Sequence, residues 1–203
     1  MGRSRPGSEQ RMMPLPLDLQ TLSEAMDAAD AAADALASRV TDEEFFWQPD
    51  QGRRWSIALC LDHLAVANAV YGRGIREAVD TARAAGWTRQ GPGKPGFFGR
   101  KFIESLEPPV KRRTSAPRKI KPLALTSRAQ ILEAYHGAHD EIRRLIADAA
   151  TIDVNRATFR NPFIGLVRVK VSTGFSVIAA HDRRHLWQAE QVEKELRGRT
   201  RPV

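Results

Sequence analysis

Four long segments of this chain place apolar residues at steps of three and four, the spacing that gives an α-helix one buried face. No segment shows a convincing strand pattern, so the apolar faces must be buried against one another. The sequence therefore predicts an all-α fold, a four-helix bundle of the up-down-down-up type. The four expected helices cover residues 15–40, 56–86, 127–150 and 174–196.

A long basic excursion separates the second and third expected helices. Residues 87–125 are dense in proline and glycine, and the segment FFGRKFIESL within them favours a helical turn. Between Arg89 and Lys121, ten Lys or Arg residues stand against two glutamates, which equals the net charge of +8 of the whole chain. Three interpretations are open: a lid that attracts an anionic substrate, a nucleic-acid contact, or a solvated loop.

The connection before the fourth expected helix carries three alternating valines, Val167, Val169 and Val171. Such alternation is typical of a short strand. A helical pattern follows directly, from Gly174 to Leu196. We therefore interpret the valines as the entry into the last helix.

We expect one domain at 14–197, with a disordered leader at 1–13 and a flexible tail at 198–203. The leader is basic but has no apolar segment behind it, which does not fit a secretory signal. No apolar run reaches the length of about 20 residues that crosses a membrane. Cys60, the single cysteine, lies in an apolar helical run and is expected to be a buried thiol. These features favour a cytoplasmic protein.

Three histidines lie on helix faces that should point into the bundle. His181 and His185 are four residues apart, which places both imidazoles on one face of the last helix. His63 lies on the apolar stripe of the second helix, and bundles build metal sites from such inward side chains. The sequence therefore predicts a metal site at these three residues, with hydrogen-bonded core histidines as the alternative. His136 and His139 are expected to be solvated or hydrogen-bonded instead.

Two stretches of the chain carry the pattern of a known family. WSIALCLDHLAVAN opens the second helix with Trp-Ser and contains His63. The second stretch is NPFIG followed by FSVIAAHDRRHLWQAEQV, which contains the pattern His-x-x-x-His at His181 and His185 and then Gln188. In this order they resemble the DinB-like superfamily of metal-binding four-helix bundles. The resemblance implies a three-histidine site open at one end of the bundle, relatives that include thiol transferases, isomerases and hydrolases, and a homodimer.

Four polar residues lie close to the expected ligands in the sequence. Gln188 is one turn beyond His185 and is a candidate for the open position or for a supporting hydrogen bond. Arg184 is a candidate for the rim of the site, with a solvated arginine as the alternative. Asp62 and Asp182 each neighbour a ligand by one position, so their side chains should point elsewhere.

The expected site suits a divalent metal ion, with zinc or nickel first and iron or manganese as further candidates. Three protein ligands leave a position for water or substrate, which is typical of catalytic sites. A metal there acidifies a bound water or thiol, so we expect hydrolysis of a small molecule or transfer of a low-molecular-weight thiol. A non-catalytic metal-binding stress-response module is the alternative. Nucleic-acid binding through residues 89–121 is a weaker third hypothesis.

Overall fold

The computed structural model of this protein describes residues 14–110, 116–164 and 166–199. In chain order its elements are α1 (Leu17–Ser38), α2 (Asp42–Phe46), α3 (Ile57–Ala84), α4 (Phe97–Leu106), the 3₁₀ turn η1 (Arg118–Ile120), α5 (Arg128–Asp148), β1 (Thr158–Arg160), β2 (Arg168–Lys170) and α6 (Val171–Arg199). The expected leader, and residues 200–203 of the expected tail, lie outside the described residues. Helix α6 continues past the expected domain end at 197.

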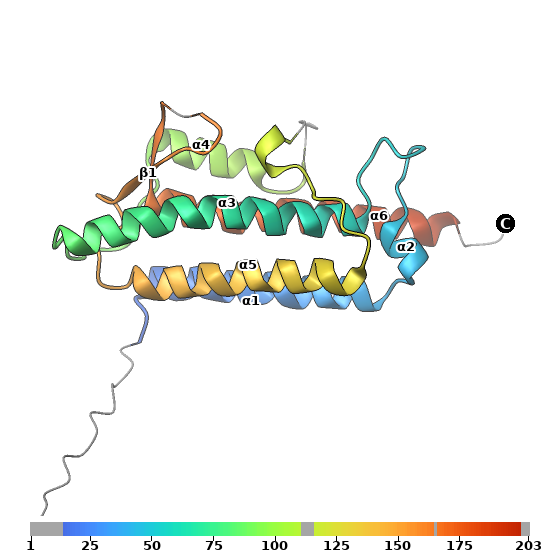
Figure 1. Cartoon of the computed structure of the whole chain (residues 1–203), viewed down its shortest axis with the longest axis horizontal. Coiled ribbons are helices and arrows are strands. Elements are labelled where there is room, and N and C mark those ends of the chain that lie inside the picture. Colours follow the sequence, from blue (N-terminus) through green and yellow to red (C-terminus); the bar gives the residue numbers. More distant parts are fainter. Residues whose placement is uncertain (1–13, 111–115, 165, 200–203) are drawn as a thin grey trace, which may run out of the picture.

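The four long helices lie side by side, with α1 and α6 running one way and α3 and α5 the other (Figure 1). This is the up-down-down-up arrangement that the sequence predicts. Helix α3 packs against both α5 and α6, and α1 also packs against both. Because α3 and α5 are parallel, the chain between them must return along the bundle. The long excursion at 87–125 follows from that requirement.

Side-chain caps set two of the helix starts. The Ser56 hydroxyl accepts a hydrogen bond from the Leu59 N–H and begins α3 where the sequence predicts it. Thr41 and Glu44 cap α2 reciprocally, each side chain bonding the backbone N–H of the other. Both caps satisfy N–H groups that a helix start would otherwise leave unpaired.

Of the three valines, only Val169 lies in a strand, β2, so its interpretation as part of a helix entry was wrong, whereas Val171 is the first residue of α6. Strand β2 pairs antiparallel with β1, with Phe159 opposite Val169. Helix α6 begins at Val171, before the expected start at Gly174. The partner strand, β1, lies in a separate stretch of the connection. The pattern of the valine segment alone therefore could not show that a partner strand is present. Phe159 is buried, and its ring packs closely against Gly74 of α3 and Gly174 of α6.

Two apolar clusters fill the bundle, one toward each end. One contains Ile75 and Phe175, and the other contains Phe45 and Leu61. Between them lies a layer of buried polar side chains from α3, α5 and α6. Its members are His63, Asn68, His139, Asp182 and His185. A buried polar group costs free energy unless it has a hydrogen-bond partner or binds an ion. Five such groups at one level of the bundle make this level a candidate functional site.

The excursion is partly helical and is attached to the bundle. Helix α4 packs against α6, and Gly99 lies against Thr173 at a separation that leaves no room for a larger residue. The other face of α4 exposes three phenylalanines, Phe97, Phe98 and Phe102.

No helix among the described residues is long and apolar enough to span a membrane. The homodimer stays a prediction.

Candidate metal centre

Three imidazoles meet in the polar layer between α3 and α6. His63 comes from α3, and His181 and His185 come from successive turns of α6. One ring nitrogen from each lies within 4.8 Å of the other two. The Nε2 atoms of His63 and His181 are 3.3 Å apart. The helix period therefore brings together the three residues that the sequence singles out.

Two protein acceptors fix how these rings are turned. Nδ1 of His63 donates a hydrogen bond to the Ile120 carbonyl oxygen at 2.5 Å. Nδ1 of His185 donates to Oε1 of Gln188 at 3.1 Å. Because each Nδ1 carries the proton, each Nε2 keeps a free lone pair directed at the other histidines. Gln188 thus supports a ligand through its second ring nitrogen.

Burial keeps the three imidazoles uncharged. Burial, with the nearby His63 and Arg184, lowers the pKa of His181 to about 3. Burial is also the largest cause that lowers the pKa of His185 well below its ordinary value. The pKa of His63 is lowered by burial too, although its bond to Ile120 opposes the shift. Neutral imidazole is the form that binds a metal, so the site is ready for one at neutral pH.

The spacing of one nitrogen pair fits two ligands of a tetrahedral ion. Two nitrogens that each bind zinc at about 2.0–2.1 Å lie about 3.3–3.4 Å apart at the tetrahedral angle. The 3.3 Å separation of the His63 and His181 Nε2 atoms matches that span. The donor set contains imidazoles and no carboxylate. Such a group suits zinc, nickel or iron rather than magnesium or calcium.

The surroundings shield one side of the histidine group. The Trp55 ring lies 4.8 Å from the His63 ring and 5.6 Å from the His185 ring, measured between centroids. Arg184 donates a hydrogen bond to the Ser105 carbonyl oxygen of α4 at 3.3 Å. The excursion therefore contacts the histidine group through Ile120 in η1, and α4 is attached to α6 at Arg184, next to His185.

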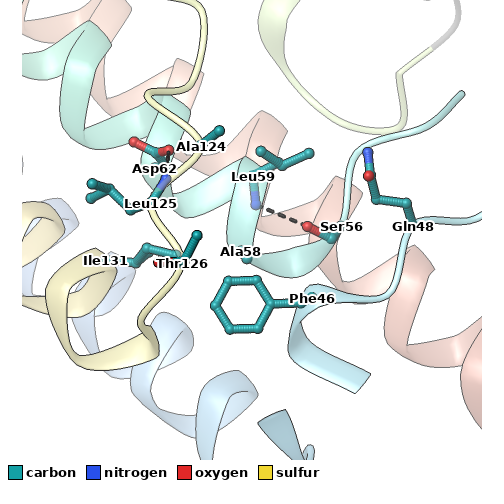
Figure 2. Close-up of a pocket in the computed structure, with 10 residues that line it drawn as sticks. All are labelled: Phe46, Gln48, Ser56, Ala58, Leu59, Asp62, Ala124, Leu125, Thr126 and Ile131. Atoms are coloured by element: carbon teal, nitrogen blue, oxygen red, sulfur yellow. Dashed lines mark hydrogen bonds between the residues drawn. The ribbon is translucent and has the colours of Figure 1, made fainter. Parts of the chain in front are cut away.

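The two neighbouring aspartates point away from the histidine group, as expected. Oδ2 of Asp62 accepts a hydrogen bond from the Leu125 N–H at 3.3 Å. Asp62 lines a separate cavity of about 330 Å³ between α3 and the start of α5, with Phe46 on its far side (Figure 2). Oδ1 of Asp182 accepts from Nδ2 of Asn68 at 3.0 Å. Neither carboxylate joins the three imidazoles.

His139 is the member of the polar layer whose role the sequence did not reveal. Its Nδ1 lies 2.6 Å from a carboxylate oxygen of Asp30, and its Nε2 lies 3.5 Å from one of Asp182. Although burial opposes it, contact with the two carboxylates raises the pKa of His139 to about 9. The side chain is fully buried, its raised pKa favours the charged form at neutral pH, and it connects α1, α5 and α6. His136 is half-buried and lies near Asp34 and Asp30.

The groups around the site that sequence reasoning missed differ in whether the sequence contains any signal for them. Asp30 and His139 each lie beside the apolar stripe of their helix, so a buried acid–base pair could have been suspected. Trp55 belongs to the Trp-Ser opening of α3, but nothing local indicates that its ring covers the imidazoles. The Ile120 carbonyl leaves no sequence signal, because every residue carries one.

The fold and the site define a class: a four-helix bundle with three histidines gathered between two of its helices. Residues 25–189 match the DinB superfamily family model. The chain belongs to the DinB superfamily, and the resemblance drawn from its motifs is confirmed. The matched region includes all three histidines and ends just after Gln188. Comparisons with curated proteins and with solved structures found no match.

Replacing Gln188 tests the support of His185. Gln188→Ala removes the acceptor for the His185 Nδ1 proton, and we expect metal affinity to fall by about 10- to 100-fold. Competition with a chelator of known affinity measures the change. Gln191→Ala is the matched control, because among the described residues Gln191 bonds the Trp187 carbonyl on the same helix and no imidazole. Equal affinities for the two variants would show that the Gln188 bond does not orient the ligand.

Proposed function

We propose that this protein is a metal-dependent enzyme that acts on a small molecule, by hydrolysis or by transfer of a low-molecular-weight thiol. The metal is a divalent ion, zinc or nickel in the first place, held by His63, His181 and His185. The observation that carries the proposal is the convergence of one ring nitrogen from each of three neutral imidazoles, with the Nδ1 protons of His63 and His185 held by protein acceptors.

The number of ligands supports catalysis over a purely structural role. Structural zinc sites are closed by four protein ligands, whereas catalytic sites use three and keep a position for water or substrate. The described group has three. A divalent ion with only neutral ligands keeps its full charge and lowers the pKa of a water or thiol that binds beside it.

The residues of this chain set the conditions for that chemistry. The Ile120 carbonyl and the Gln188 amide hold the ring protons on Nδ1, which fixes the direction of the ligand lone pairs. Trp55 excludes water from one side of the imidazoles. Arg184 adds positive charge near His181 and His185, which favours an anionic form of the reacting group.

Activity assays on the metal-loaded protein test the proposal. We expect turnover either of a thiol with an electrophile or of a hydrolysable ester or amide. His181→Ala should lower it to the uncatalysed rate. His136→Ala, which removes an imidazole outside the metal centre, should keep it.

Two results would count against the enzyme. Turnover that survives His181→Ala would place the chemistry elsewhere. A stably bound metal without turnover on either class of substrate would favour the non-catalytic module. The non-catalytic module has its own support, because an ion held by His63, His181 and His185 would link α3 to α6 and so stabilise the bundle.

A further inference from the structure

A second cavity, of about 450 Å³, lies where α3 meets η1 and β1. Three of its lining residues are cations, Arg73 from α3, Lys119 from η1 and Arg160 from β1. They come from three parts of the sequence, and only Lys119 belongs to the basic excursion. We call this cavity the cationic cleft.

The charges of the cationic cleft are not neutralised by the protein. Among the described residues, neither Arg73, Lys119 nor Arg160 pairs with a carboxylate, and no acid lines the cavity. By contrast, Arg76, one turn further along α3, and Arg89 each contact carboxylates of other helices. Three like charges around one cavity repel one another, and a bound anion relieves that repulsion.

The rest of the lining is apolar. Val70 of α3, Phe159 of β1 and Pro162 form the remaining walls, beside Gly74. Nζ of Lys119 donates to the Pro162 carbonyl oxygen at 3.2 Å, which ties η1 to the hairpin across the cavity. A hydrated inorganic ion would leave this apolar surface unused. An organic anion with an apolar body would cover it.

The cationic cleft adjoins the metal centre. Lys119 lines the cleft, and the next residue, Ile120, accepts the hydrogen bond from His63. Val70 lies two turns after His63 on nearly the same face of α3, roughly 10 Å along the helix axis. Along α3 the cleft therefore lies within about the length of a small organic molecule from His63.

We propose that the cationic cleft binds the anionic end of the substrate, a small organic carboxylate or phosphate with an apolar body. As a substrate site it rests on the proposed function, but its anion binding does not require the metal. Contacts to a part of the substrate remote from the reacting bond position that bond at the metal centre.

Phenyl phosphate is a suitable probe, titrated into the metal-free full-length protein while amide NMR signals are followed. We expect a dissociation constant of about 1 mM or below, with shifts around α3, η1 and β1. Arg73→Ala combined with Arg160→Ala should weaken binding by about tenfold or more. Arg53→Ala and phenol are the controls, one removing a remote arginine and the other removing the charge of the probe. Both arginines of the cleft are exposed, so the fold should survive their loss.

Each outcome decides the matter. Loss of binding in the double variant, but not in Arg53→Ala, supports the cationic cleft. Equal binding by the double variant and the wild type, or no binding at all, overturns it. Inorganic phosphate binding as tightly as phenyl phosphate contradicts the apolar body. The titration uses metal-free protein, so it tests the cationic cleft independently of the proposed function. The proposed function fails if the protein takes up no metal or shows no turnover.

Discussion

His181→Ala is expected to lower the affinity for the metal by more than about a hundredfold, the largest effect on binding that a single change should produce here. Losing a supporting hydrogen bond costs about 10- to 100-fold, and losing a ligand atom costs more. Metal content after purification, followed by titration against a chelator, measures the loss. His136→Ala is the control, and it should retain about one equivalent of metal per chain, as the wild type should.

His181→Ala should have little effect on the stability of the metal-free protein, or should stabilise it. Without an ion, three neutral imidazoles hold ring nitrogens against one another away from water, and polar atoms without a hydrogen-bond partner cost stability there. Removing one relieves part of that cost. Thermal unfolding with and without metal should therefore show that metal stabilises the wild type but not the variant. A metal-induced increase in stability that His181→Ala leaves intact would exclude these histidines as the binding site.

His139→Ala is expected to cost about 3–5 kcal/mol in the free energy of unfolding, the largest effect on stability expected of a single change. The variant leaves the carboxylates of Asp30 and Asp182 without their shared cation, and Asp182 is almost fully buried. Urea unfolding of the metal-free protein measures the cost. His136→Ala, whose side chain also faces Asp30 but is half-exposed, should cost less than about 1 kcal/mol.

The pH dependence supplies a second measurement on His139. Its pKa is about 9 in the folded protein, against an ordinary value of 6.5. The folded state therefore binds the extra proton more tightly, and the stability from this group is complete below pH 6.5 and is lost as the pH rises through 9. The difference in stability between wild type and His139→Ala should shrink over that window. A constant difference from pH 6 to 10 would mean that His139 is not a buried cation.

Much of the fold could be predicted because its signals are local. The apolar stripes locate the four long helices within a few residues, and the Ser56 cap sets the start of α3. The valine strand could not be recognised in the same way. Whether such a segment becomes a strand depends on a partner strand, and β1 lies in a separate part of the chain.

The metal-site histidines were predictable for a related reason. The spacing of His181 and His185 determines that they share a helix face, and helical phase turns His63 toward them. The family pattern then strengthens the assignment. Spacing along one helix could not show that Asp182 turns to His139, because that contact requires α5 and α6 to be placed against each other.

The sequence by itself determined the helices, their apolar faces and the three histidines, because backbone geometry converts residue spacing directly into direction. Tertiary structure alone decided the groups that make the three histidines a site. The Ile120 carbonyl and the walls of the cationic cleft come from segments far apart in the chain, and the Trp55 ring covers the imidazoles only once its segment folds back on α3 and α6. Their contacts exist only when those segments pack, and no periodicity in one segment encodes what another will place beside it.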